Sequence, residues 1–259
     1  MREEMNMERK TALITGAAKG IGKATALALA QAGYDIIVNY HSDRAGALQV
    51  FQAAESMGVQ AFPVYADLAR TDDIRRMYEE FFARFSRLHV LVNNAGVSDE
   101  VYFLDATEEH FDKVTAVDWK GLFFCAQYAA RGMIAAGISG VIINVTSNQA
   151  EGCWPRATIY GPTKAAVSKF TKNAAMELAP HGVRMVAVAP GYTDIGWPAD
   201  SHLREAEKLL PLRRFAQPAE IAKAIVYLAS QDASYMTGSV LTIDGGATLP
   251  VVACNDFVK

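Results

Sequence analysis

A tyrosine and a lysine four residues apart, Tyr160 and Lys164, form a pair that could move a proton. In a helix, residues at this spacing lie on one face, a turn apart. A free phenol has a pKa of about 10, and a nearby ammonium favours its ionised form. Ser147, thirteen residues upstream, could hydrogen-bond a substrate oxygen and stabilise charge developing there. The set predicts acid–base chemistry at a carbonyl or alcohol; the alternative is a strand-end serine and an ordinary exposed helix pair.

A glycine-rich segment near the N-terminus, Thr15-Gly16-Ala17-Ala18-Lys19-Gly20-Ile21-Gly22, follows an apolar run. Its glycines allow a tight turn and a close approach of the backbone to a phosphate, and a helix beginning there offers free N–H groups and the positive end of its dipole. An ordinary strand–helix turn could use the same glycines. The residues expected to bind the pyrophosphate of a dinucleotide are Gly16, Lys19, Gly20, Ile21 and Gly22.

Apolar runs alternate with helix-length amphipathic segments along the chain. The expected strands are Thr11–Thr15, Asp35–Tyr40, Gln60–Tyr65, Val90–Asn93, Val141–Thr146, Met185–Ala189 and Val240–Ile243. The expected helices are Ile21–Ala32, Ala45–Met57, Asp72–Phe85, Glu108–Ala136, Ile159–Ala179 and Ala219–Ser230. Several of the strands are apolar without alternation, which is typical of parallel strands buried on both faces. The pattern predicts an α/β fold with a doubly wound, seven-stranded parallel sheet between two layers of helices.

Composition narrows the class of protein. The chain has 259 residues, 51% of them hydrophobic, and a formal net charge of -3, which gives no electrostatic case for a nucleic acid or an anionic membrane as partner. Met1–Lys10 lacks the apolar core of a signal peptide, and no apolar run reaches membrane-spanning length. Cys125, Cys153 and Cys254 show no metal-type spacing and fit reduced thiols, so we expect no metal and a cytoplasmic location.

Four elements occur in a fixed order: the glycine-rich turn, Asn93-Asn94-Ala95-Gly96, Ser147, and the Tyr160–Lys164 pair. In this order and spacing the chain resembles the short-chain dehydrogenase/reductase family from about Arg9 to Thr248. The resemblance implies one Rossmann-type domain over residues 1–259, with a cofactor half at about 9–100 and a catalytic and substrate half at about 101–250. It also implies an NAD(P)(H)-dependent oxidoreductase that interconverts a secondary alcohol and a ketone.

The resemblance carries further cofactor contacts onto this sequence. Asp67 and Leu68 would hold the adenine, although Asp67 could equally be a helix cap or turn residue. The segment under the adenosine ribose would be Asn94, Ala95 and Gly96, which could otherwise form a simple turn. Tyr160 and Lys164 would contact the nicotinamide ribose. The contacts expected after the sixth strand are Pro190, Gly191 and Thr193.

The end of the second strand predicts which dinucleotide is used. NAD-specific proteins commonly place an acid there for the ribose 2′-hydroxyl, whereas a nearby cation accommodates the 2′-phosphate of NADP. Tyr40 stands where the acid would be, Lys19 supplies a cation, and His41 and Ser42 could donate hydrogen bonds. We therefore expect NADP(H) to be favoured. NAD(H) remains the alternative, because Asp43 is near and no arginine follows directly.

Two positions depart from the pattern of similar proteins. An asparagine usually completes a water-mediated proton relay to the lysine, and Asp118 occupies that position here. Asp118 would serve unchanged if the relay uses its backbone carbonyl, but its carboxylate would stabilise the Lys164 ammonium and oppose phenolate formation. Similar proteins also place a threonine where Ile195 stands, and Thr193 could replace it from two positions earlier.

The substrate is a small molecule whose pocket we expect to be closed by a long irregular segment, Gly191–Gln217, acting as a lid. The candidate substrate contacts, any of which could simply be packing residues, are Gln149, Trp154, Tyr192 and Trp197. Aromatic and polar lining suits a sugar, a polyol or another small alcohol.

A rival substrate is a 3-oxoacyl group on acyl carrier protein, whose acidic surface needs a basic docking patch. Ile134-Ala135-Ala136-Gly137 and Ala175-Met176-Glu177 occupy the places where such reductases carry cations. A nucleotide-sensing regulator without catalysis would often lose the serine, tyrosine and lysine, and all three are present. Pairing of the long helices across a homodimer or homotetramer interface is implied by the resemblance; a monomer core could use the same apolar face.

Overall fold

The computed structural model of the chain describes residues 9–198 and 201–249, which contain one seven-stranded, all-parallel sheet with strand order β3-β2-β1-β4-β5-β6-β7. The strands are β1 (Thr11–Ile14), β2 (Asp35–Tyr40), β3 (Ala61–Tyr65), β4 (Val90–Asn93), β5 (Val141–Val145), β6 (Arg184–Pro190) and β7 (Val240–Ile243). The four central strands β1, β4, β5 and β6 are buried almost throughout, as their unbroken apolar runs predict. The expected doubly wound parallel fold is confirmed.

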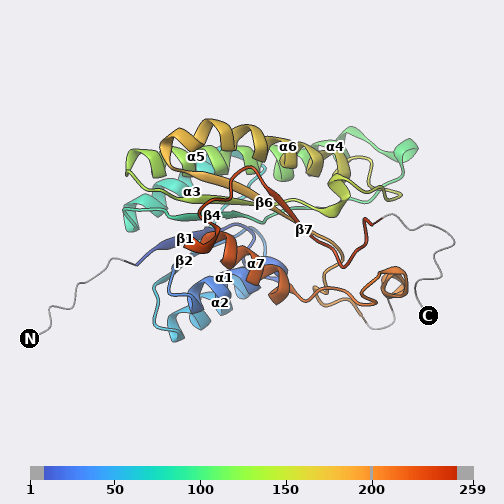
Figure 1. Cartoon of the computed structure of the whole chain (residues 1–259), viewed down its shortest axis with the longest axis horizontal. Coiled ribbons are helices and arrows are strands. Elements are labelled where there is room, and N and C mark those ends of the chain that lie inside the picture. The colour runs from blue at the N-terminus through green and yellow to red at the C-terminus, as the bar shows by residue number, and fades with distance from the viewer. Residues whose placement is uncertain (1–8, 199–200, 250–259) are drawn as a thin grey trace, which may run out of the picture.

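Helices cover both faces of the sheet (Figure 1). One layer contains α1 (Gly20–Gln31), α2 (Arg44–Ser56) and α7 (Pro218–Ala229). The other contains α3 (Thr71–Arg84), α4 (Glu108–Thr115), α5 (Leu122–Ala135) and α6 (Tyr160–Leu178). Each layer has its own apolar core against the sheet, and the large side chains Tyr78, Phe81 and Met133 are fully buried in the second. Burial on both faces fixes where each strand ends.

The order of the strands reverses between β1 and β4, which lie side by side with Ile14 opposite Val92. In doubly wound sheets the crevice outside the carboxyl ends of the strands at such a switch point is the usual ligand site. The glycine-rich turn follows β1, and Asn94 follows β4, so both segments leave the sheet at this crevice. The fold therefore brings the expected cofactor segments to one place.

The expected single helix Glu108–Ala136 is interrupted, which corrects the prediction from sequence. A π-helical turn, Ala116–Gly121, separates α4 from α5. Gly121 lies in that turn, and a Cβ on it would be 2.4 Å from the carbonyl oxygen of Leu68. Such a wide turn inserts an extra residue into the helix and changes the direction of the side chains it carries. Asp118 is one of them.

A buried series of hydrogen bonds links two strands to α6. Asn93 donates to the side-chain oxygen of Asn144 at 2.9 Å, and Asn144 donates to Thr171 Oγ1 at 2.9 Å. Thr171 in turn donates to the carbonyl of Val167. All three side chains are at most 2% exposed. The underside of α6 is therefore held to the sheet by directional polar contacts as well as by apolar packing.

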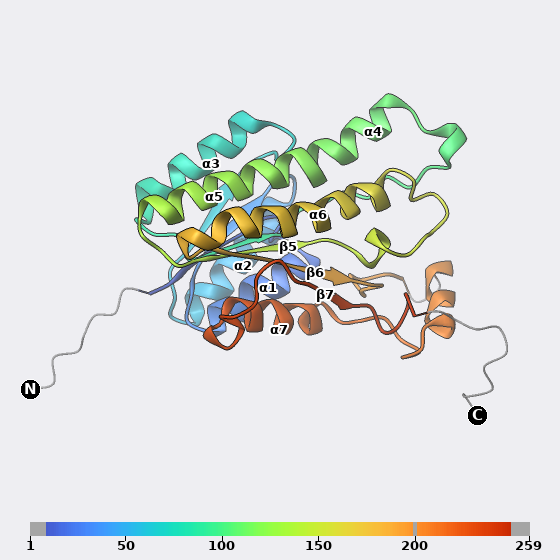
Figure 2. The same ribbon diagram turned by 45° about the horizontal axis from the view of Figure 1, so that its top comes forward.

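The segment between β6 and α7 is less irregular than its sequence suggests, because it contains a 3-10 helix, η5 (His202–Leu209). Figures 1 and 2 both show η5 apart from the two helical layers, beyond one end of the sheet. Short 3-10 segments also occur at η1 (Phe103–Asp105), η3 (Asn148–Ala150), η4 (Ala179–His181) and η6 (Gln231–Ala233). Within the residues described, no helix combines the length and apolar character needed to cross a membrane.

Candidate active site

The proton-transfer pair lies at the first turn of α6. Tyr160 is the first residue of the helix and is half-buried, and Lys164 follows one turn later with 3% exposure. The Lys164 Nζ lies 5.3 Å from the centre of the Tyr160 ring and donates a hydrogen bond of 3.2 Å to the carbonyl of Val145. The carbonyl of Lys164 accepts a 2.7 Å bond from Thr146 Oγ1, so the first turns of α6 are tied to the end of β5.

Ser147 stands where β5 ends and η3 begins. Its Oγ accepts the N–H of Gln149 at 3.2 Å and makes a long, 3.4 Å bond to the side-chain oxygen of Asn148. Ser147 is 8% exposed. A hydroxyl that donates only one long bond can exchange it for a substrate oxygen.

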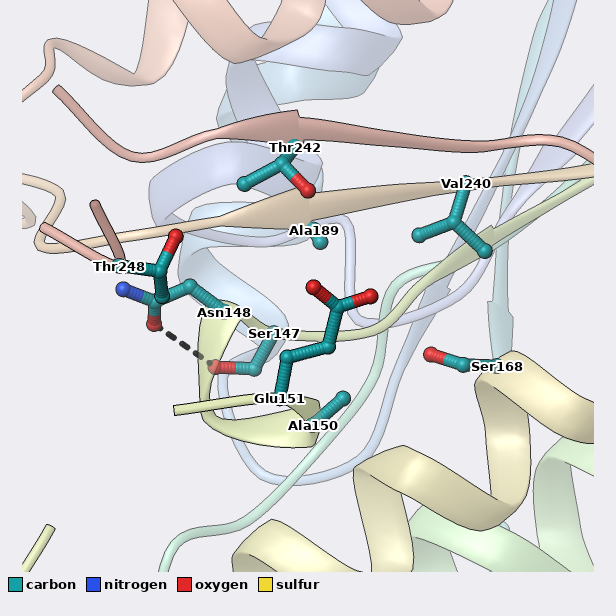
Figure 3. A pocket seen from close by; sticks show the side chains of 9 residues that line it. All are labelled: Ser147, Asn148, Ala150, Glu151, Ser168, Ala189, Val240, Thr242 and Thr248. Carbon is teal, nitrogen blue, oxygen red and sulfur yellow. Dashed lines mark hydrogen bonds between the residues drawn. The ribbon is translucent and has the colours of Figure 1, made fainter. Parts of the chain in front are cut away.

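Ser147 also borders a small pocket in which its neighbours from η3 meet Ser168, Ala189 and Thr242 (Figure 3). Tyr160 and Lys164 do not line this pocket. The pocket lies behind the serine, between η3 and strands β6 and β7, and we do not assign it to the substrate.

Asp118 is fully buried in the π turn, and its carboxylate points at the lysine. Oδ2 lies 3.0 Å from Lys164 Nζ, and Oδ1 accepts the backbone N–H of Val97 at 2.7 Å. Oδ2 has no hydrogen bond of good angular geometry, so the contact with the ammonium is an ion pair. Gly96 makes room for it, because a Cβ there would be 2.8 Å from Oδ2 and 3.4 Å from Nζ. The structure thus joins the Asn94–Gly96 segment to the candidate catalytic pair, Tyr160 and Lys164, through Asp118.

Electrostatics keep this lysine charged. Burial lowers the pKa of Lys164, but the negative charges of ionised Tyr160 and of Asp118 outweigh burial, and the net direction is upward from the ordinary lysine pKa. A positive charge is therefore held beside the phenol ring of Tyr160.

The glycine-rich turn has the shape of a backbone cradle. Gly16 and Gly20 have positive φ angles of 61° and 55°, which side chains other than glycine adopt at a cost. A Cβ on Gly16 would lie 2.9 Å from the Cα of Ala95, and one on Gly22 would lie 2.3 Å from the carbonyl oxygen of Gly16. Asn94 donates to the carbonyl of Thr15 at 2.9 Å and so fastens the turn to the end of β4. Only glycine permits this packing, and the turn opens α1 at Gly20.

The end of β2 presents several polar groups to solvent. Tyr40 is half-buried, and its ring meets that of Tyr65 edge to face with 6.0 Å between the ring centres. His41 and Ser42 are exposed. Lys19, on the glycine turn, is also exposed.

The structure places two residues near this strand end in ways that the sequence alone did not reveal. Asp43 is the N-cap of α2 and accepts the N–H of Gly46 at 2.8 Å, so its carboxylate is already engaged. Arg44 is the exposed first residue of α2, four positions after Tyr40. Arg44 lies beyond the strand end, where a cation for the 2′-phosphate is not ordinarily expected; the N-cap signal at Asp43 followed by a cation is the pattern that points to it.

Asp67, expected either to hold the adenine or to serve as a cap or turn residue, makes a turn contact. Its Oδ1 accepts the N–H of Ala69 at 3.0 Å, which is a local turn contact, and the residue is half-buried. Leu68 is buried, with its carbonyl close to Gly121 of the π turn. The second oxygen of Asp67 is not used by the turn.

The segment after β6 closes onto the glycine turn. Pro190 is buried, and Gly191 packs so closely that a Cβ would be 2.7 Å from the Cα of Asp244. Thr193 is 9% exposed, with its Oγ1 bonded to the carbonyl of Gly191 at 3.1 Å. The Cγ2 of Ile195 lies 3.3 Å from where a Cβ on Gly20 would stand.

The four candidate substrate residues differ in how they are held. The Tyr192 ring stacks on the Phe215 ring, with 5.2 Å between the ring centres. Trp197 donates its indole N–H to the carbonyl of Thr193 at 3.2 Å. Trp154 packs over Gly152, and the side-chain oxygen of Gln149 is buried without a hydrogen-bond partner. Trp197 is 37% exposed and is the most open of the three aromatic residues.

The segment expected to act as a lid is tied to the end of β6 by one arginine. Arg204 of η5 donates to Asp194 at 2.9 Å, to the carbonyl of Trp197 at 3.0 Å and to Glu207 at 2.7 Å. Asp194 also accepts the N–H groups of Gly196 and Trp197. The hydrogen bond from Arg204 and that from the Gly196 N–H lower the pKa of Asp194.

The residues described contain no group of three or more His, Cys, Asp or Glu side chains placed to hold a metal ion. Cys125 is a buried free thiol and Cys153 an exposed one, while Cys254 lies outside the described residues.

Comparison with known proteins shows a close relationship over almost the whole chain. The family model described as Enoyl-(Acyl carrier protein) reductase matches residues 16–248. An uncharacterized oxidoreductase of Escherichia coli (strain K12), YohF, is 41% identical over 243 residues, covering 93% of this chain and 96% of that protein. The 3-oxoacyl-[acyl-carrier-protein] reductase FabG of Staphylococcus aureus (strain Mu50 / ATCC 700699) is 38% identical, covering 92% of this chain and 97% of the relative.

Solved structures agree with these relatives. The acetoin dehydrogenase from Enterobacter cloacae superimposes with a TM-score of 0.89 at 37% identity, covering 96% of this chain and 99% of that one. A short chain dehydrogenase from Burkholderia cenocepacia J2315, solved in complex with NADP, gives a TM-score of 0.87 at 29% identity, covering 92% of this chain and 97% of that one.

Proposed function

Because the chain belongs to the short-chain dehydrogenase/reductase family, we propose that it is an NADP(H)-preferring oxidoreductase that interconverts a small secondary alcohol and the corresponding ketone. The observation that carries the proposal is the geometry at α6. A buried ammonium lies 5.3 Å from the centre of the Tyr160 ring, and Ser147 ends the strand to which Lys164 is bonded. This arrangement suits proton transfer at a substrate oxygen.

Each of the three residues has a distinct task in this proposal. In ketone reduction the phenol of Tyr160 donates a proton to the carbonyl oxygen, and in alcohol oxidation its phenolate accepts the hydroxyl proton. Lys164 stabilises the phenolate by its charge, and Ser147 donates a hydrogen bond to the substrate oxygen. A bound nicotinamide cofactor supplies or accepts the hydride. General acid–base catalysis of this kind contributes roughly 10²–10⁴-fold to the rate.

The residues present fit a nicotinamide dinucleotide. A Cβ on Gly16 or Gly22 would fill the cradle, and the first turn of α1 offers unpaired N–H groups to a pyrophosphate. Asp67, Leu68 and the Asn94–Gly96 segment would hold the adenosine. Pro190, Gly191 and Thr193 would border the nicotinamide.

Preference for NADP over NAD is supported by the charges around the end of β2. Tyr40 removes the acid that would accept a ribose 2′-hydroxyl, and Lys19 and Arg44 are exposed cations on the segments that flank it. Asp43, the acid that would weaken phosphate binding, is engaged by the N–H of Gly46. His41 and Ser42 remain available as donors.

The proposed substrate class is supported by the side chains of the candidate contact residues and by the relatives. Large rings at Trp154, Tyr192 and Trp197, together with the amide of Gln149, suit a compact polar molecule such as a polyol, a sugar or a small hydroxyketone. One similar solved structure is an acetoin dehydrogenase, and acetoin is such a hydroxyketone. Acetoin and the diol and diketone related to it are therefore the first substrates to test.

The alternative is reduction of a 3-oxoacyl group on acyl carrier protein, the activity named for one relative at 38% identity. An acidic carrier protein requires a cationic docking surface. The two places expected to carry it present Ile134 at 38% exposure and Met176 at 78% exposure, with Glu177 also exposed. These surfaces favour a free small molecule over a carrier-bound substrate.

We also propose that the protein acts in the cytoplasm as a homodimer or homotetramer. Its free cysteines suit a reducing compartment. In the helical layer that contains α4, α5 and α6, Phe111 is 55% exposed. In the same layer, the rings of Trp119, Phe123 and Phe170 form a half-buried cluster. An apolar surface of this kind suits a second subunit. Light scattering coupled to size-exclusion chromatography measures the state directly.

The function is tested by measuring turnover with NADP⁺, NAD⁺, NADPH and NADH across alcohols, polyols, sugars, acetoin, diacetyl and a 3-oxoacyl thioester in free and carrier-bound form. We expect the highest kcat/KM with NADP(H) and a small alcohol or ketone. A carrier-bound 3-oxoacyl thioester that outperforms its free thioester would establish the alternative. Absence of turnover with every substrate, while NADPH still binds, would reject the catalytic proposal.

A further inference from the structure

The ion pair between Asp118 and Lys164 is almost completely buried. Asp118 has 0% exposure and Lys164 has 3%, and their charged atoms are 3.0 Å apart. Taking two charges out of water is costly, and the attraction between them offsets that cost only when the geometry is good and the remaining hydrogen-bonding atoms have partners. A neutral side chain at position 118 would leave the buried ammonium without its counter-charge, which is more costly than burying the pair.

The hydrogen-bond donors around position 118 show what the carboxylate achieves. The backbone N–H of Val97 faces Oδ1 at 2.7 Å, and the Lys164 ammonium faces Oδ2 at 3.0 Å. Both are donors, so both need an acceptor. A carboxylate has two acceptor oxygens, whereas the amide of an asparagine has one, and its NH₂ would face either Val97 or Lys164 donor to donor. The site is therefore built for an ionised aspartate.

The charge of this aspartate also acts on Tyr160. The Lys164 ammonium lies 5.3 Å from the centre of the phenol ring and 3.0 Å from Oδ2 of Asp118. The distance from Oδ2 to the ring centre therefore cannot exceed the sum of these two distances. At such range, in a buried site, the negative charge of the carboxylate repels a second negative charge on the phenol. The carboxylate thus offsets part of the help that Lys164 gives to the phenolate.

We propose that Asp118 is a positioning residue that fixes the Lys164 ammonium beside Tyr160 and, through its own charge, moves alcohol oxidation to higher pH. This inference deepens the proposed oxidoreductase function and rests on it. Gly96 belongs to the same device, because its missing side chain leaves the space in which the carboxylate and the ammonium meet. The role lies in the Asp118 side chain, in addition to any use of its backbone carbonyl.

Other charged groups lie on elements packed against this part of α6. Glu151 follows η3 and is exposed at the pocket that Ser147 borders, Lys120 is exposed on the π turn, and Lys113 of α4 pairs with Asp99 at 3.0 Å. None of the four is in contact with Lys164 or Tyr160 in the interactions of the described residues. They stay unchanged in a variant at position 118, so a difference between two pH profiles isolates Asp118.

The first experiment compares the pH dependence of kcat/KM for alcohol oxidation in the parent protein and in Asp118→Asn. We expect the rising limb to move to lower pH by about one unit. Asp118→Ser, which keeps one acceptor for Val97, should move it in the same direction if the asparagine variant does not fold. Superimposable profiles, or a movement to higher pH, would overturn the proposal.

Asp35→Asn is a matched control. Asp35 is also buried at 5% exposure, accepts one backbone N–H, that of Gln60 at 2.8 Å, and faces one cation, Arg9, at 3.9 Å. It lies at the start of β2, at the opposite end of the strands from the site. Its substitution removes the same charge and should leave the limb in place. An equal movement in Asp35→Asn would assign the effect to general stability or net charge and reject the role of Asp118.

A second measurement does not depend on turnover. The tyrosinate absorbance of the parent protein is titrated with pH, and the same titration of Tyr160→Phe is subtracted to isolate Tyr160. Repeating both in the Asp118→Asn background should show Tyr160 ionising at lower pH. If it ionises at the same pH although the kinetic limb moves, the titrating group is Lys164 and the proposal is wrong. If the tyrosinate shift occurs but no substrate is turned over, the electrostatic role stands and the proposed function fails.

Discussion

The guanidinium of Arg204 lies 2.9 Å from the carboxylate of Asp194, and this contact ties η5 to the end of β6. The same arginine holds the carbonyl of Trp197, a candidate substrate contact, and it pairs with Glu207 inside η5. One side chain therefore sets where the lid stands relative to the segment that lies over Gly20. Substituting Arg204 should therefore change the position of the lid segment without altering the groups proposed to carry out the chemistry at Tyr160.

We predict that Arg204→Met raises the KM for substrate several-fold and changes kcat less, because the lid loses its anchor while Tyr160, Lys164 and Ser147 stay in place. Steady-state kinetics measures the split. Without ligands, hydrogen exchange over residues 191–217 should be faster in Arg204→Met than in the parent protein. In the parent protein, exchange of the same residues should slow once cofactor and substrate are bound together.

Lys208→Met is the control for Arg204, since Lys208 lies in the same 3-10 segment and pairs only with Glu205 at an exposed position in the interactions described. It should leave KM and exchange unchanged. Equal exchange of the segment with and without both ligands in the parent protein would contradict the lid assignment.

Tyr160→Phe should remove nearly all turnover, by roughly 10²–10⁴-fold, because the proton donor and acceptor is lost while the ring still packs at the start of α6. NADPH binding, followed by its fluorescence, should remain close to that of the parent. Tyr235→Phe provides the comparison, because Tyr235 is fully exposed and far along the chain from the site. A Tyr160→Phe protein that keeps half of the parental kcat would exclude the assignment.

Lys19→Ala and Arg44→Ala should each reduce the ratio of kcat/KM with NADP⁺ to that with NAD⁺, by roughly tenfold, because each removes a charge that can bond a 2′-phosphate. The activity with NAD⁺ should change little. Lys223→Ala on α7, also an exposed lysine, tests whether a loss of net positive charge has the same effect. A parent protein that uses NAD⁺ better than NADP⁺ would reject the cofactor preference.

Glu220 links the end of the lid segment to α7. Hydrogen bonds from Arg214 and from the N–H of Gln217 lower the pKa of Glu220 from 4.5 to about 2. A carboxyl whose pKa is depressed in the folded state adds stability that is fully present above its ordinary pKa, and loses it as pH falls towards the folded value. The contribution should therefore be complete above about pH 4.5 and vanish towards pH 2.

Glu220→Gln should lower the Tm at pH 7 by about 1–2 °C, a small effect because the pair is largely solvated. The difference from the parent should shrink as pH falls below 4.5. Glu205→Gln, in the exposed pair with Lys208, should give a smaller difference at neutral pH. A Glu220→Gln difference that grows as pH falls would contradict the direction of the linkage.

The order of elements and the place of the glycine turn were predictable because they depend on local patterns. Apolar runs such as Ile36–Val38 are buried on both faces whatever packs against them, and the strand ends follow from where those runs stop. Gly16 and Gly22 are required by contacts with Ala95 and with the turn itself. Ser147, Tyr160 and Lys164 then share the carboxyl end of the sheet because parallel topology leaves no other place for them.

The details of position 118 could not be predicted from sequence. Helix periodicity is the same for an unbroken helix and for one with a π turn, since a single extra residue changes the face but not the composition. The direction of the Asp118 side chain depends on that turn, on the missing side chain of Gly96 and on the N–H of Val97, which is distant in sequence. The lid contacts of Arg204 likewise depend on folding of a segment with little periodic pattern.

The hydrophobic effect beneath a helix has no preferred direction, whereas a hydrogen bond depends on the angle between its partners. The bond from Asn144 to Thr171 has a direction, and it breaks if α6 turns by one residue position, about 100°. The bond from Asn93 to Asn144 joins two strands and holds the Asn144 amide in place. Breaking the bond to Thr171 would leave buried polar groups unpaired. These neutral side chains therefore fix the rotation of the helix about its axis, and the direction of Tyr160 and Lys164 is set in the protein interior, two turns along α6 from Lys164 and three from Tyr160.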